Sequence, residues 1–154
     1  MIVWNRTLLG LLVTLLMGCQ TRLVMPLAIA PEDVCSYCKM SISEKRYAAQ
    51  CIDRDGEAFK FDDLTCMIAS NKESNIVGRF VMDFAAKQWV RAEDAIYVQS
   101  DEINAPMGGG TIAFRDESNA QLAAATYHGK LLRFDEVFSR KTNSLGESES
   151  FKGR

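Results

Sequence analysis

The chain has 154 residues, of which 47% are hydrophobic and 25% are charged, and its formal net charge is −2. These values are typical of a globular protein with one domain or two small ones, and they exclude a disordered or collagen-like chain. They also argue against nucleic acid as a partner, because proteins that bind it collect Lys and Arg against the phosphates.

An apolar run near the start of the chain predicts export. Residues 8–17 are uninterrupted by charge but too few for a membrane-spanning helix, which needs roughly 20 apolar residues. The run is typical of a signal peptide, which we place at residues 1–18. It ends in Leu-Met-Gly-Cys, which resembles the lipobox of bacterial lipoproteins, so we expect Cys19 to be acylated. An ordinary signal peptide and an uncleaved anchor are the alternatives.

Lipidation at Cys19 would place the protein outside the cytoplasm, anchored to the inner or the outer bacterial membrane. Residues 19–31 contain two prolines and no clean period, so we expect a tether there. Residues 32–138 form the predicted domain. The polar residues 139–154 are expected to be a disordered tail.

The first elements of the domain are predicted to be a hairpin and a helix. The turn pair Asp55-Gly56 lies between β-prone segments, which predicts strands over 46–53 and 57–61. Asp62 follows as the predicted N-cap of a helix. That helix begins at Leu64 and has an i, i+3, i+4 apolar pattern.

Four further strands and a second helix follow. Residues 118–127 are rich in Ala and predict a helix, with Ser118 as its N-cap and Gly129 just beyond its end. The expected strands cover 79–84, 89–91, 96–100 and 130–134.

A sequence pattern occurs twice in the chain. Residues 56–64 and 129–137 share a turn glycine, a short strand, a basic residue, Phe, an acidic pair and an aliphatic residue, with starts 73 residues apart. Since this spacing is about half of the mature chain, we predict an α+β fold of two related β-rich halves packed together, about 32–85 and 86–138. Chance similarity is the alternative.

Sulfur side chains gather in two short motifs. Cys35, Cys38 and Met40 form C-x-x-C-x-M, and Met107 lies between Pro106 and three glycines. Thiolate and thioether sulfurs are soft donors that favour Cu(I). Cys38 and Met40 are two residues apart, so on an extended segment they would share a face, while Cys35 would join them only through a turn.

The cysteines are also compatible with other roles. A Cys35–Cys38 pair outside the cytosol is also typical of a disulfide or a thioredoxin-type redox site. Zinc is disfavoured because Cys51 and Cys66 do not form a second matched pair and His128 is the only histidine. We interpret Cys66 as a buried structural thiol and His128 as a partner of a helix C-terminus, and we assign Cys51 no role.

Enzymatic activity is not expected. The sequence has no nucleophile elbow, no zincin helix and no P-loop. Both acidic pairs of the repeated pattern are explained as helix caps.

In combination, these motifs resemble the NosL family, the accessory lipoproteins of nitrous oxide reductase maturation. The resemblance runs from about Val34 to Val137. It rests on the lipobox, C-x-x-C-x-M at 35–40, the Phe-Asp-Asp-Leu-x-Cys-Met run at 61–67, Asp-Phe at 83–84, Pro-Met-Gly at 106–108 and the closing run at 129–135.

The resemblance implies a Cu(I)-binding lipoprotein of two ββαβ-like halves that supplies copper to nitrous oxide reductase. The family's metal-binding Cys and Met fall on Cys38 and Met40, and its Pro-Met-Gly methionine falls on Met107. Many members have Gly where this chain has Lys39. A cation at that position could tune the affinity of a neighbouring thiolate.

The sequence thus predicts a lipid-tethered Cu(I) chaperone with Cys38, Met40 and Met107 as primary ligands and Cys35 as a fourth. The expected partners are the membrane and a copper acceptor, nitrous oxide reductase or a related copper protein. The oligomeric state is not predicted. The rival hypothesis is an extracytoplasmic thiol-disulfide oxidoreductase that uses Cys35 and Cys38.

Overall fold

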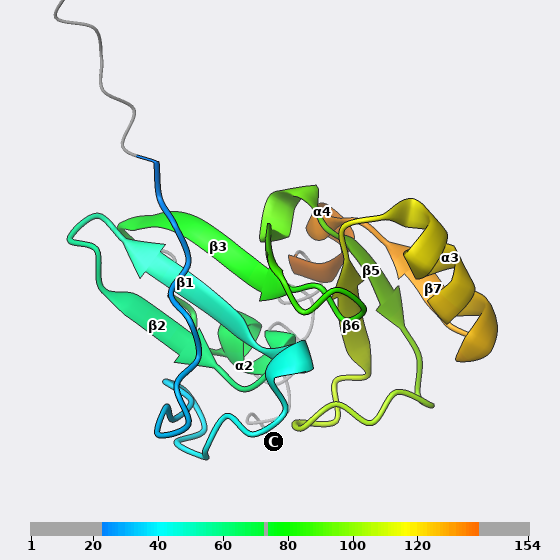
Figure 1. The fold of residues 1–154 in the computed structure, drawn as a ribbon, viewed down its shortest axis with the longest axis horizontal. Coiled ribbons are helices and arrows are strands. Elements are labelled where there is room, and N and C mark those ends of the chain that lie inside the picture. The colour runs from blue at the N-terminus through cyan, green and yellow to red at the C-terminus, as the bar shows by residue number, and fades with distance from the viewer. Residues whose placement is uncertain (1–22, 73, 139–154) are drawn as a thin grey trace, which may run out of the picture.

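The computed structural model describes residues 23–72 and 74–138 (Figure 1). The predicted signal peptide, the acylation at Cys19 and the polar tail lie outside these residues. Within them, no helix has the length and apolar character needed to cross a membrane.

The first sheet is antiparallel, with strand order β2-β1-β3-β4. The predicted hairpin is confirmed: β1 and β2 pair on either side of Gly56, whose φ of +87° suits glycine in a tight turn. The strands are β1 (Ala49–Asp53), β2 (Ala58–Phe61), β3 (Ile76–Met82) and β4 (Trp89–Arg91).

The second sheet is also antiparallel, with strand order β6-β5-β7. It consists of β5 (Ile96–Gln99), β6 (Thr111–Phe114) and β7 (Lys130–Leu132). Sequence reasoning missed β6, which follows the run of three glycines. The molecule is therefore an α+β protein with two antiparallel sheets, which lie side by side in Figure 1.

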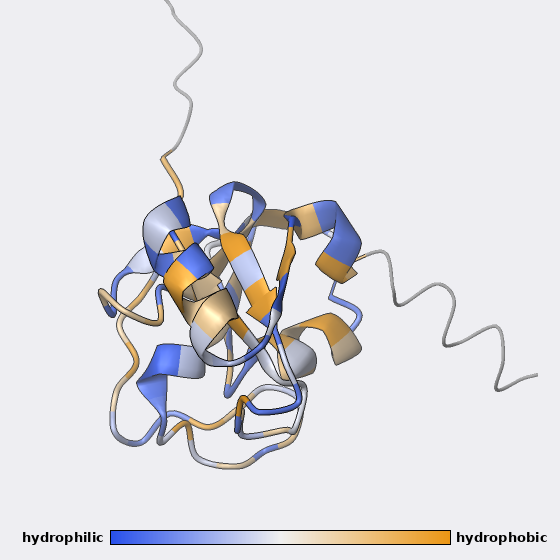
Figure 2. Ribbon diagram, turned by 90° about the vertical axis from the view of Figure 1, so that its right-hand side faces the viewer, coloured by the Kyte–Doolittle hydropathy of each residue, from blue (hydrophilic) through white to orange (hydrophobic). Residues whose placement is uncertain are grey.

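Each sheet carries a helix between its second and third strands in chain order. In the first sheet this helix is α2, and in the second it is α3, which carries both hydrophilic and hydrophobic residues (Figure 2). The helices are α2 (Leu64–Ala69), α3 (Glu117–Thr126) and α4 (Phe134–Phe138), and the 3-10 turns are η2 (Lys45–Tyr47) and η3 (Ala92–Asp94).

Both predicted N-caps are wrong by one or two residues. Asp63, not Asp62, caps α2, because its extended backbone lets its side chain accept a hydrogen bond from the backbone N–H of Cys66. Helix α3 begins at Glu117 with Asp116 at the N-cap position, so Ser118 lies in the first turn.

Two predicted strands are shorter than expected by two or more residues, and those expected over 57–61 and 96–100 each by one. Residues 45–47 form η2, so the first strand begins at Ala49. The strand expected over 130–134 ends at Leu132, because the chain turns into helix α4 at Phe134.

One hydrophobic core spans both sheets. Phe61 from the first sheet and Tyr97 from the second are each fully buried in it, and the Tyr97 hydroxyl donates to the carbonyl of Ala92 over 2.7 Å. A smaller apolar cluster lies under α3, around Val98 and Phe114.

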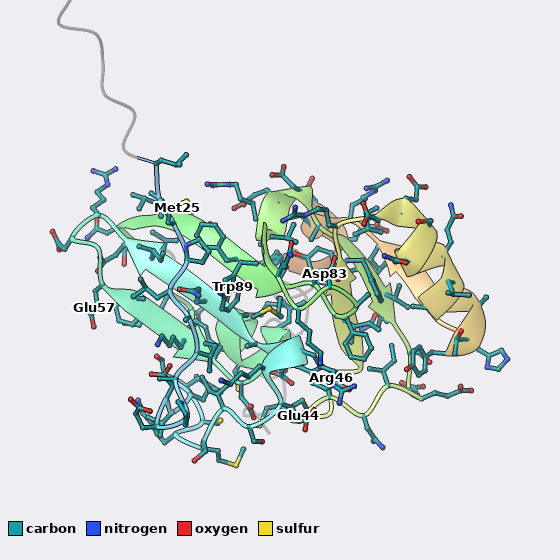
Figure 3. The ribbon with its side chains drawn as sticks, in the orientation of Figure 1. Met25, Glu44, Arg46, Glu57, Asp83 and Trp89 are labelled. Atoms are coloured by element: carbon teal, nitrogen blue, oxygen red, sulfur yellow. The ribbon has the colours of Figure 1, made fainter. Side chains whose placement is uncertain are left out.

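Asp83 joins the two sheets at the end of β3, where they meet in Figure 3. Its buried carboxylate accepts from the N–H groups of Ala85 and Ala86 on one side. On the other it accepts from the N–H of Arg115, just after β6, over 2.7 Å.

An N-terminal strap, residues 23–31, crosses the first sheet in front of β1 (Figure 1). The fully buried Gln50 side chain holds it by accepting from the Leu27 N–H and donating to the Leu27 carbonyl, over 3.0 and 2.8 Å. Lys60 adds a hydrogen bond to the carbonyl of Ala28. The strap thus leads the chain across the sheet to the cysteine motif.

Candidate metal site

The C-x-x-C-x-M motif forms a closed turn at the end of the strap. The N–H of Cys35 donates to the carbonyl of Met40 over 2.7 Å, and the N–H of Lys39 donates back to the carbonyl of Cys35. Lys39 has a φ of +64°, so Cys38 and Met40 do not lie on the extended segment that would give them a shared face. The turn is docked on β2 by the N–H of Ser36, which donates to the carbonyl of Lys60.

Three thiols meet beneath this turn. The Sγ atoms of Cys35, Cys38 and Cys66 all lie within 4.8 Å of one another. Cys35 and Cys66 are buried, Cys38 is half-buried, and none of the three is in a disulfide. We call these residues the thiol cluster. Soft sulfur donors at this spacing are suited to a soft monovalent metal.

Sequence reasoning missed Cys66 as a member of the cluster. In the sequence it lies next to the apolar face of a predicted helix, a position typical of a structural thiol. The fold brings it to Cys35, 31 positions earlier, because α2 starts directly after β2, the strand on which the turn is docked. The sequence feature that could have pointed to Cys66 is the Phe-Asp-Asp-Leu-x-Cys-Met run at residues 61–67, which contains it.

The surroundings of Cys35 favour its thiolate. Burial acts to raise the pKa of this thiol, but hydrogen bonds from the backbone N–H groups of Asp62, Cys38 and Tyr37 outweigh it and leave the pKa below its usual value. The neighbouring Cys66 differs, because burial and then the adjacent Cys35 raise its pKa well above the usual range. The cluster thus contains one thiol prepared for deprotonation and one that holds its proton.

The two predicted methionine ligands lie at the surface beside the cluster. Met40 is 49% exposed and closes the cysteine turn through its carbonyl. Met107 is 37% exposed, and its N–H donates to the Oδ2 atom of Asp63 over 3.0 Å. Their segments are therefore attached to the elements that carry the thiols, while both methionines stay exposed to solvent.

Cys51 and His128 lie elsewhere. Cys51 is buried on β1, and loss of solvation raises the pKa of its thiol to about 11. His128 follows α3 with a φ of +48°, and its Nδ1 atom lies 3.0 Å from the Oε1 atom of Glu102 at the surface. Neither residue belongs to the thiol cluster.

Fold and site together define a small α+β protein with two antiparallel sheets and a sulfur site suited to a soft metal. The NosL family model matches residues 26–141, which is most of the chain. The chain belongs to the NosL family.

A solved structure supports the fold. The crystal structure of the copper chaperone NosL from Shewanella denitrificans matches with a TM-score of 0.67 and 20% sequence identity, covering 74% of this chain and 96% of that one. No curated protein sequence matches the chain.

Proposed function

We propose that this protein is a carrier of Cu(I), not an enzyme, and that copper is its cargo. The observation that carries the proposal is the meeting of three free thiols within 4.8 Å in a protein of the NosL family. Three thiols so close can share one ion, and thiolates favour Cu(I) over hard cations. The copper chaperone whose crystal structure has the same fold supports the same conclusion.

The proposed ligands are Cys38, Met40 and Met107, with Cys35 as the fourth, as the sequence predicts. The thiol cluster adds Cys66 as a candidate. Because a thioether has no proton to lose, the methionines can bind copper at any pH, whereas each cysteine must release its proton.

The depth of these groups supports a transfer route. Met40 and Met107 are exposed and Cys38 is half-buried, while Cys35 and Cys66 are inside. An incoming ion meets the outer sulfurs first and exchanges one ligand at a time for the inner cysteines, each of which releases its proton to solvent as it binds. The reverse sequence hands the ion to an acceptor. The acceptor expected for this family is nitrous oxide reductase or a related copper protein.

We also infer the wider organisation of the chain. The domain spans residues 32–138 and consists of two related ββαβ halves, about 32–85 and 86–138. The shared element order and the central position of the first strand in each sheet support this kinship. A signal peptide, acylation at Cys19 and a tether that begins there would hold the domain on the extracytoplasmic face of a bacterial membrane. Residues 23–31 of the expected 19–31 tether are the strap, which is hydrogen-bonded to the first sheet through Gln50 and Lys60.

Anaerobic Cu(I) titration of the reduced full chain in detergent, against a chromogenic Cu(I) chelator, tests the proposal. Cys35→Ser and Cys38→Ser should each weaken binding roughly 10- to 100-fold, because each removes a soft ligand. Cys51→Ser is the matched control, since it removes a buried thiol outside the cluster, and should bind as the wild type does. Equal affinity of all four proteins would refute the proposal.

The burial of Cys35 argues against the oxidoreductase hypothesis. Its favoured attacking sulfur is Cys35, because the surrounding N–H groups lower the pKa of that thiol, but the Cys35 side chain is fully buried. A thiol that attacks a protein disulfide has to reach it. Reduction of insulin at a rate abolished by Cys35→Ser would favour the oxidoreductase over the carrier.

A further inference from the structure

A single buried carboxylate connects the methionine loop to the thiol cluster. The side chain of Asp63 is 1% exposed, and each of its two oxygens accepts one backbone hydrogen bond. Oδ1 accepts from the N–H of Cys66 over 2.9 Å, and Oδ2 accepts from the N–H of Met107 over 3.0 Å. The two donors are 41 positions apart in the chain. Cys66 lies in α2, which belongs to the first sheet, and Met107 lies in the loop between β5 and β6 of the second sheet.

A second, independent contact holds the loop that carries Met107 against α2. A Cβ atom at Gly109 would lie 1.8 Å from the Oγ1 atom of Thr65, the residue next to Cys66. The loop therefore approaches the first turn of α2 more closely than any side chain would permit. Gly108 supports the approach with a φ of +73°, a conformation that glycine adopts without strain.

We infer that Asp63 is the positioning residue that brings Met107 to the thiol cluster, so that both sheets contribute sulfur to one copper site. This inference rests on the proposed function. Asp63 itself supplies no ligand atom. It holds the helix that carries Cys66 with one oxygen and the loop that carries Met107 with the other. Groups that orient metal ligands in this way typically contribute roughly 10- to 100-fold to metal affinity.

Two substitutions separate the two roles of Asp63. Asp63→Ser keeps a good N-cap for α2 but has no second oxygen for Met107. Asp63→Asn keeps the shape and one acceptor, but its amide nitrogen cannot accept a hydrogen bond. Asp83→Asn is the matched control, because Asp83 is equally buried and also joins the two sheets, at a place away from the cysteine turn.

The copper readout is a double-mutant cycle measured by anaerobic Cu(I) competition on the full chain. We expect Met107→Ala to weaken binding about tenfold in the wild type and in Asp83→Asn, and to have little further effect in Asp63→Ser. A loss that is simply additive with Asp63→Ser would show that Asp63 does not act through Met107, and would overturn the inference. So would an unchanged affinity of Met107→Ala in a protein that still requires Cys38.

A metal-free readout keeps the inference distinct from the proposed function. The N–H of Met107 should exchange slowly with solvent deuterium in the wild type, because a buried carboxylate accepts it, and rapidly in Asp63→Ser. Asp83→Asn should leave that exchange slow. Rapid exchange in the wild type would show that Asp63 does not hold the Met107 loop, whatever the result of the copper titration. A wild type that binds no Cu(I) but keeps slow exchange at Met107 would refute the proposed function and the shared copper site, and would leave only the structural link between Asp63 and the loop.

The Gly109 contact gives a test that leaves Asp63 intact. Gly109→Ala should displace the loop and weaken Cu(I) binding to the level of Met107→Ala. Thr65→Ala in the same chain removes Oγ1 and leaves the Thr65 Cβ atom as the nearest neighbour, 3.1 Å from the added methyl. This double variant should therefore recover most of the affinity. Lack of recovery together with normal binding by Asp63→Ser would overturn the inference.

Discussion

Lys39 occupies a backbone conformation that disfavours its own side chain. Its φ of +64° is in the left-handed region, where an L-residue is strained by about 1–2 kcal/mol and glycine is not. The requirement comes from the turn itself, because the bonds between Cys35 and Met40 close around this residue. The glycine that the family resemblance places here therefore has a conformational reason. The Lys39 ammonium donates to the carbonyl of Ser36 over 2.7 Å.

We expect Lys39→Gly to stabilise the protein. Relief of the left-handed strain outweighs the entropy that glycine adds to the unfolded chain, by roughly 0.5–1 kcal/mol. Lys39→Ala is the control, because alanine keeps the strain and loses the ammonium bond, and should be no more stable than the wild type. Thermal unfolding followed by circular dichroism ranks the three proteins by melting temperature. A melting temperature of Lys39→Gly below that of Lys39→Ala would contradict this explanation.

The raised pKa of the Cys51 thiol predicts that the protein loses stability at alkaline pH. Its pKa is raised to about 11 in the folded protein from an ordinary value of 9.0. Between these values the unfolded chain releases the thiol proton while the folded protein keeps it, so the free energy of unfolding falls as pH rises. The full difference is about 2–3 kcal/mol.

Cys51→Ser isolates this effect. Serine does not titrate in the range, whereas the neighbouring thiols titrate alike in both proteins. Urea unfolding of the reduced proteins at pH 8, 9, 10 and 11 should show the wild type losing stability relative to the variant above pH 9. Parallel pH profiles would show that Cys51 is not the origin.

At the scale of elements, the N-terminal strap depends on one buried side chain. Gln50 is fully buried, and its amide pairs with both backbone groups of Leu27 as a neighbouring strand would. The strap continues directly into the cysteine turn. Its attachment therefore fixes where that turn begins.

We expect Gln50→Leu to release the strap. Leucine keeps most of the volume but cannot pair with the backbone of Leu27, which should lower stability by about 1–3 kcal/mol. Limited proteolysis should cut within residues 23–31 faster than in the wild type. Gln121→Leu on the exposed face of α3 is the control and should be cut no faster. Equal cleavage of the wild type and Gln50→Leu would mean that other contacts hold the strap.

The sequence predicts those elements whose signals are local. The β1–β2 hairpin follows from Asp55-Gly56, and α2 follows from its apolar period. Strand β6 has four residues after three glycines, and α4 has five residues, so neither has enough length for a period to emerge. The pairing of Gln50 with the strap joins residues 23 positions apart, and no local pattern encodes it.

At the scale of the whole molecule, the sulfur site depends on how the two sheets meet. Sequence reasoning identified Cys35 and Cys38 as a pair because they are neighbours in the chain, and the structure brings them together. It missed Cys66 and Asp63, because their importance arises only when α2 packs beneath the cysteine turn and against the loop before β6. Residue type predicts which atoms can bind copper, whereas the fold decides which of them meet.

The close approach of Gly109 to Thr65 also constrains how this protein can diverge. With no room for even a methyl group between them, a larger side chain at position 109 becomes acceptable only after position 65 has become smaller. Substitutions at these two positions therefore have to occur in a fixed order. A lineage that replaced the glycine first would displace the loop that carries Met107 from α2.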